Sequence, residues 1–297
     1  MKTETQAPAR SERIAIRNIL VMTDFSPRSE AALNYAAGWA RKMGATIHVA
    51  HFIRPALFAV AWDAYGPLME KVREDGRAGL AAIDARPDLQ DVPHTTYLDP
   101  VDILDGLKGL IEAQHIDLVV LASAARKGLG KVLLGSTAET VFRSVPNPVL
   151  MLGPRVRLPE KTPEVRTLLF ATDFGPATAR AAMFACSLAQ ELQARLYLLH
   201  VLPLPGVENA PRKSEVAVAE RQLGALVPAG AASWCEPMPL ILAGDPSVEI
   251  VKATDATQAD LIVVGTRRPP RLPAYTGWAT AYQVLHESPC PVLTVRE

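Results

Sequence analysis

The feature that most constrains this chain is an internal repeat. The segment NILVMTDFSP at residues 18–27 returns as TLLFATDFGP at residues 167–176, and Asp24 and Asp173 are separated by the same interval as His51 and His200. Later, IDLVVLA returns as ADLIVVG and NPVLML returns as CPVLTV, both at one slightly shorter interval. Four blocks repeated in one order show that a single domain occurs twice.

The repeat sets the expected domain limits. We predict a first domain over residues 15–154 and a second over residues 165–297, called copy one and copy two below. Residues 155–164, RVRLPEKTPE, are charged, contain two prolines and lack apolar periodicity, so they are predicted to form a linker.

Each copy alternates short apolar runs with longer segments of helical period. Apolar residues recur at steps of three and four over residues 31–43 and 103–111, and Ser26 with Pro27 is a typical helix start. Strands without polar alternation, separated by helices, indicate a parallel sheet covered on both faces. We therefore expect two tandem Rossmann-like α/β domains, each a five-stranded, mainly parallel sheet with helices on both faces. In copy one the predicted strands are Ile19–Met22, Thr46–Ala50, Thr95–Leu98, Leu118–Leu121 and Val149–Leu152.

The last apolar run of each copy predicts how the copies pack. Val149–Leu152 and Val292–Val295 would each expose an unpaired strand edge in an isolated domain. Pairing one edge with the other removes both, so we expect an intramolecular pseudo-dimer.

Composition limits the classes of partner. Lysine plus arginine and aspartate plus glutamate each number 31, so net charge gives no reason to expect nucleic acid or an anionic membrane as partner. The chain shows no signal-peptide pattern and its apolar runs are too short to span a membrane, which predicts a cytoplasmic protein. Cys186, Cys235 and Cys290 form no metal-binding or paired pattern and are expected to be free thiols.

Two segments of copy one favour a ligand at the carboxyl end of the sheet. Asp24 directly follows the first strand, where its carboxylate either accepts hydrogen bonds from a ligand or caps the turn into the helix. After the fourth strand comes a basic loop with Arg126 and Lys127, and then Ser136 and Glu139 at capping-box spacing. A helix start of this kind is a natural phosphate site, although an ordinary capped helix is the alternative.

These segments resemble the universal stress protein family, and the likeness spans residues 15–297. It rests on NILVMTDFSP, the HF after the second strand, IDLVV, GSTAETVFRSVPNPVL and their second-copy partners. The resemblance implies a fold of the adenine nucleotide alpha hydrolase type, and ATP or AMP bound in copy one. In ATP-binding members, a Gly-x-x-Gly, nine residues, Gly-Ser/Thr motif wraps the phosphates. By resemblance, Asp24 and the backbone of Phe52 contact adenine and ribose, and the phosphate contacts fall at Ala122, Ala124, Ala125, Gly135 and Ser136. We add three neighbours to this expected site: Arg126 and Lys127, which would supply positive charge, and Thr137.

Both copies depart from that motif. In copy one, Ala122 and Ala125 replace the first two glycines. Copy two keeps Gly265, but Arg268 replaces the second glycine, prolines follow, and Trp278 stands at the Ser/Thr position. Copy two is therefore expected to be a degenerate site.

The resulting hypothesis is a stress-response binding or signalling module without catalytic residues or a metal site. Two alternatives stay open: a nucleotide-free interaction scaffold with unknown protein partners, and a slow adenine-nucleotide hydrolase using copy one. His48 and His51 are three apart in a strand, so they face opposite sides and cannot chelate one ion. The apolar run 56–62 is the best candidate for a protein-partner surface.

Overall fold

A computed structural model describes residues 14–53, 62–99, 103–123, 134–158, 163–204, 211–229, 231, 235–267 and 276–297. Within this part, copy one alternates strands and helices as the repeat predicted. Its elements are β1 (Asn18–Met22), α1 (Pro27–Met43), β2 (Thr46–Phe52), α2 (Trp62–Asp84), β3 (His94–Asp99), α3 (Ile103–Ala113), β4 (Leu118–Ala122), α4 (Ser136–Ser144) and β5 (Val149–Leu152), with a short 3-10 helix at Pro87–Leu89.

Copy two repeats the same order with shorter connections. Its elements are β6 (Thr167–Ala171), α5 (Thr178–Leu192), β7 (Arg195–Leu202), α6 (Lys213–Ala225), β8 (Pro237–Ala243), α7 (Pro246–Thr257), β9 (Leu261–Thr266), α8 (Thr276–Glu287) and β10 (Val292–Arg296).

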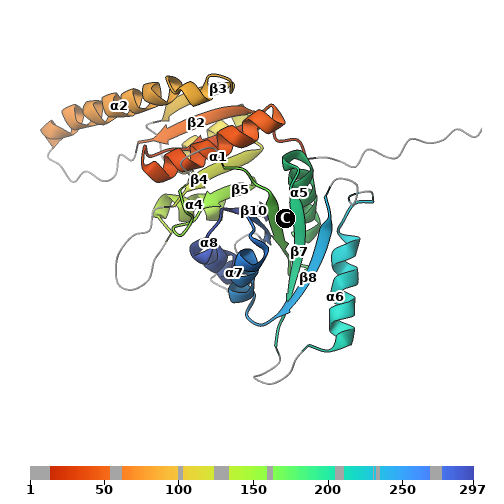
Figure 1. Ribbon diagram of the computed structural model, residues 1–297. Helices are drawn as coiled ribbons and strands as arrows, with labels where there is room; N and C mark the ends of the chain where they lie inside the picture. Colours follow the sequence, from red (N-terminus) through yellow and green to blue (C-terminus); the bar gives the residue numbers. More distant parts are fainter. Residues whose placement is uncertain are drawn as a thin grey trace, which may run out of the picture.

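The two sets of five strands form one ten-stranded sheet, which runs through the whole molecule (Figure 1). The strand order is β3-β2-β1-β4-β5-β10-β9-β6-β7-β8. Neighbouring strands within each copy are parallel, whereas β5 and β10 pair antiparallel, with Leu150 opposite Leu293. The two edges predicted to pair therefore do so, and neither β5 nor β10 is an edge of the sheet.

Burial of both sheet faces explains why the strands read as continuous apolar runs. Buried side chains of α1, α2, α5 and α6 cover one face, and those of α3, α4, α7 and α8 cover the other. Each face is a single hydrophobic cluster that contains residues of both copies. The fold class expected from the sequence is confirmed.

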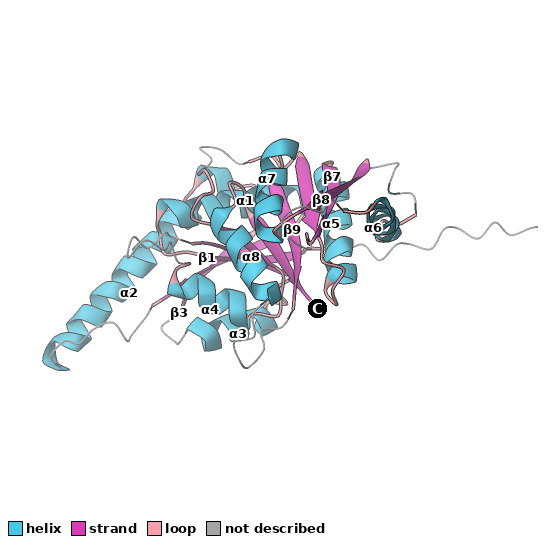
Figure 2. Ribbon diagram, turned by 90° about the horizontal axis from the view of Figure 1, so that it is seen from below, coloured by secondary structure: helices cyan, strands magenta, loops and turns pink. Residues whose placement is uncertain are grey.

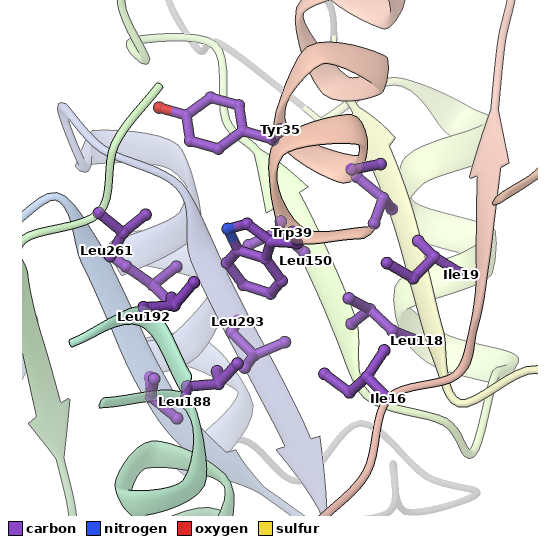
Figure 3. Close-up of a cluster of buried hydrophobic side chains, with 14 of the residues drawn as sticks. Ile16, Ile19, Tyr35, Trp39, Leu118, Leu150, Leu188, Leu192, Leu261 and Leu293 are labelled. Atoms are coloured by element: carbon purple, nitrogen blue, oxygen red, sulfur yellow. The ribbon is translucent and has the colours of Figure 1, made fainter. Parts of the chain in front are cut away.

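The core is continuous across the junction between the copies. Trp39 of α1 is 2% exposed and belongs to the same buried cluster as Leu150 of copy one and Leu188 and Leu293 of copy two (Figure 3). The buried Arg296 of β10 adds a polar contact by donating to the carbonyl of Phe142 in α4. The junction therefore resembles the interior of one domain.

A shared core predicts that the copies unfold together. Leu293→Ala should lower the free energy of unfolding by about 2–5 kcal/mol, because Leu293 is fully buried and truncation leaves a cavity. Urea curves from far-UV circular dichroism and from tryptophan fluorescence should each show one transition and shift together, because two of the four tryptophans lie in each copy. Val248→Ala, on an exposed position of α7, is the control and should change stability by less than about 0.5 kcal/mol. Two separate transitions, with only one displaced, would contradict a shared core.

Candidate functional site

Copy one contains a cavity of about 430 Å³ beyond the carboxyl ends of β1, β2 and β4. Its wall is completed by Val72 of α2, Ile103 of α3 and the first residues of α4. Of the ten residues predicted as ligand contacts, six line this cavity: Asp24, Phe52, Ala122, Gly135, Ser136 and Thr137. Ala124, Ala125, Arg126 and Lys127 lie outside the described residues, as does most of the apolar run 56–62.

The Asp24 carboxylate is held by the turn that follows β1. Its Oδ1 accepts hydrogen bonds from the backbone N–H and the hydroxyl of Ser26, at 3.1 and 2.5 Å. Phe25 has a φ of 60°, a left-handed conformation that is uncommon for a bulky residue. Asp24 thus has the capping role weighed from the sequence, while its side chain remains exposed and lines the cavity.

Packing on both sides holds Phe25 in this conformation. Its ring lies 4.4 Å from that of His51, and it occupies the space where a side chain on Gly79 of α2 would stand. His51 Nδ1 lies 2.9 Å from the carbonyl oxygen of Thr23, so this nitrogen carries the proton and donates. His51 is therefore a hydrogen-bond donor at the end of β2, and it also lines the cavity.

The hydrogen bonds of Ser26 set the charge state of Asp24. Burial alone would raise the pKa of the Asp24 carboxyl, but bonds from the side chain and backbone of Ser26, with a further one from Ser29, outweigh it. The pKa of Asp24 consequently lies below its ordinary value. The cavity therefore presents a carboxylate at neutral pH.

The start of α4 differs from the capping box predicted from the sequence. Gly135, which has no side chain to form a capping bond, is the N-cap, and Ser136 is the first helical residue. The prediction fails because Ser123 Oγ accepts from the Gly135 N–H at 3.1 Å, while Glu139, one residue too deep in the helix, pairs with Arg143 at 3.0 Å. The N-terminus of α4, which is the positive end of its helix dipole, still lines the cavity with Gly135, Ser136 and Thr137.

Arg28, in the first turn of α1, joins the strands beneath this site. Its Nε donates to the carbonyl of Ser123 at 3.0 Å, and its Nη2 donates to the carbonyl of Gly153. No sequence pattern indicates this contact, because Arg28 is far from both partners along the chain. It fixes the end of β4 relative to α1.

Copy two contributes to the copy-one site through Tyr282 of α8. Its hydroxyl accepts a hydrogen bond of 3.3 Å from the backbone N–H of Leu134, directly before Gly135. The helices α4 and α8 lie side by side in both ribbon views (Figures 1 and 2). No periodicity or motif indicated this role, since it depends on the packing of one copy against the other.

The equivalent place in copy two also holds a cavity, of about 260 Å³. The turn after β6 repeats that of copy one: Phe174 has a φ of 56°, and Asp173 Oδ1 accepts from the Gly175 N–H at 2.8 Å. Copy two therefore retains both the turn and a cavity, and the expectation of a degenerate nucleotide site there stays a prediction. Trp278 has no described side chain, and Arg268 lies outside the described residues.

Other candidate chemistries gain no support from the described part of the chain. There, no group of three His, Cys, Asp or Glu side chains is arranged to hold a metal ion. No described helix is both long and apolar enough to cross a membrane. The three cysteines are buried free thiols, and burial raises the pKa of Cys186 to about 12.

Comparison with known proteins gives one consistent family. The profile of the universal stress protein family matches residues 15–153 and 164–296. A universal stress protein of Mycolicibacterium smegmatis is 27% identical, covering 94% of this chain and 96% of its own. One of Synechocystis is 25% identical, covering 95% and 100%. The crystal structure of a universal stress protein from Archaeoglobus fulgidus covers 94% of this chain and 98% of its own, with a TM-score of 0.69 at 21% identity, which indicates the shared fold.

The Asp24 turn yields a test by substitution of Ser26. Ser26→Ala should raise the pKa of Asp24 and cost about 1 kcal/mol of stability through loss of the α1 cap. A depressed folded-state pKa gives stability that is present above the unfolded pKa and lost as the pH falls through the folded pKa. The loss of stability on acidification should therefore be smaller in the variant. Carboxyl carbon NMR titration measures the pKa, and Ser214→Ala, exposed on α6, should leave it unchanged. An Asp24 pKa unaffected by Ser26→Ala would rule out this account of the turn.

Proposed function

The chain belongs to the universal stress protein family, and from this premise we propose that copy one binds an adenine nucleotide, ATP or AMP. The protein would act as a cytoplasmic stress-response module that reports nucleotide occupancy to protein partners. Residues 15–154 and 165–297 are the proposed domains, joined by the linker 155–164. The antiparallel pairing of β5 with β10 is proposed to replace an interface between separate subunits.

One observation carries the proposal: a single cavity gathers the described residues that the family resemblance assigned to the nucleotide. Asp24 lies in the turn after β1 and Phe52 ends β2, where adenine and ribose contacts are expected. Gly135 and Ser136 come from the start of α4, where the helix dipole favours a phosphate. These residues are far apart in sequence, yet all of them line this cavity, which supports the proposal.

The alanine at the first glycine position is compatible with this proposal. Ala122 ends β4 and its φ is not positive, so its Cβ imposes no backbone strain. The cavity is also the larger of the two equivalent ones, at about 430 Å³ against about 260 Å³.

In copy two the corresponding aspartate has a competing partner. The Arg267 guanidinium lies 3.7 Å from the Asp173 carboxylate at the cavity mouth. A nucleotide would have to separate Asp173 from Arg267 before it could bind. Within the described residues, Asp24 forms no such ion pair. We therefore propose one nucleotide per chain.

Calorimetric titration with AMP and ATP tests this assignment. Asp24→Ala and Ser136→Ala should each weaken binding about tenfold or more, because hydrogen bonds to charged groups contribute about 1.5–3 kcal/mol. Asp173→Ala, the matched variant in copy two, should leave affinity nearly unchanged. Binding that survives Asp24→Ala and disappears with Asp173→Ala would reverse the assignment, and no binding at millimolar nucleotide would reject it.

The contact between the copies gives a second test. Tyr282→Phe removes the hydroxyl that accepts from Leu134, and should weaken AMP binding about two- to tenfold, since a typical hydrogen bond contributes about 0.5–1.5 kcal/mol. Tyr97→Phe is the control, because the Tyr97 hydroxyl contacts His48 and does not line the cavity. Equal effects of both variants on AMP affinity would show that Tyr282 has no specific role.

A further inference from the structure

The cavity of copy two is chemically different from that of copy one. Its inner wall is apolar and is built by side chains of β6, β7, β9, α7 and α8. The principal apolar residues are Leu199, Val201, Ile250, Val264, Ala281 and Val284.

Polar groups on the floor of this cavity already have partners. The hydroxyls of Thr172 and Thr178 lie 2.8 Å apart, and Thr172 Oγ1 also accepts from the Phe174 N–H at 3.0 Å. The Thr172 carbonyl accepts from His200 Nδ1 at 2.8 Å. These polar atoms already have hydrogen-bond partners, and burial of apolar surface is favourable. An apolar ligand group therefore binds this floor more favourably than a polar one.

Charges of both signs stand at the mouth. Asp173 and Arg267 line the cavity, and their side chains are 68% and 58% exposed. The distance of 3.7 Å between Arg267 Nη2 and Asp173 Oδ2 exceeds that of a direct hydrogen bond. Exposed ion pairs contribute little to stability. A ligand that separates Arg267 from Asp173 therefore loses little stabilising free energy.

Size argues against a nucleotide in this place. The volume of about 260 Å³ lies below the range of about 300–1,000 Å³ common for sites that take drug-sized ligands. Arg267 also stands where copy one has Ala124. A smaller molecule, with an apolar body and a charged end, fits the volume and the walls better.

We propose that the copy-two cavity binds a small zwitterion with an apolar body, namely an α-amino acid with an aliphatic side chain such as leucine. The carboxylate would pair with the guanidinium of Arg267, which can donate two parallel hydrogen bonds. The ammonium would pair with Asp173, and the side chain would fill the apolar interior. In an α-amino acid the ammonium and carboxylate groups are bonded to the same carbon, which matches the adjacent opposite charges of Asp173 and Arg267 at the mouth. This proposal does not rest on nucleotide binding by copy one.

Equilibrium dialysis of the full chain with labelled L-leucine tests the proposal. Leucine should bind at one site per chain. L-leucinamide, which lacks the carboxylate, and 4-methylpentanoate, which lacks the ammonium, should each compete at least tenfold more weakly. Arg267→Ala and Asp173→Asn should each weaken leucine binding at least tenfold. Both substitutions are at exposed side chains, and thermal melting checks that the variants fold.

Matched controls separate this site from copy one. Asp24→Asn and Arg166→Ala, the latter at a side chain 80% exposed and paired with Glu164, should leave leucine binding unchanged. Equal competition by leucinamide or 4-methylpentanoate, displacement of leucine by AMP, or no leucine bound at millimolar concentration would each overturn the proposal.

Discussion

The antiparallel pairing of β5 with β10 is the contact on which the rest of the molecule depends. It joins two parallel half-sheets, removes two apolar strand edges and brings α1 and α5 onto one continuous core around Trp39. Because the pairing is antiparallel, the carboxyl ends of the parallel strands point in opposite directions in the two copies. Each copy therefore has its own cavity beyond the carboxyl ends of its strands, and the two cavities stay separate.

The two cavities share a frame and differ in their chemistry. In both copies an aspartate follows the first strand, a phenylalanine with positive φ comes next, and a histidine from the second strand packs on its ring at 4.4 Å. Copy one combines this turn with a helix start, whereas copy two places Arg267 beside Asp173. Duplication in one chain allows such divergence, because each copy has its own turn and its own cavity-lining residues. Tyr282 is the point where copy two still contacts the copy-one site.

Periodicity and the repeat were sufficient to predict the fold, because both depend on patterns of burial that the sequence carries directly. Ser26 and Pro27 start α1 as predicted, and the last strands pair as predicted. The start of α4 was predicted wrongly because Ser123, remote in sequence, takes the Gly135 amide. Tyr282, Arg28 and Arg267 were not identified as contacts of the sites for the same reason: their roles follow from tertiary packing. The contacts expected at residues 124–127 stay predictions.

One continuous sheet carries both copies, and we propose that it bears two unequal sites, one in each copy. Hydrogen exchange of the full chain, measured by mass spectrometry with AMP and with leucine added separately, tests it most directly. We expect AMP to protect residues 23–29 and 134–138, and leucine to protect residues 171–178 and 279–284. Protection of both sets by AMP, or of neither set by either ligand, would contradict it.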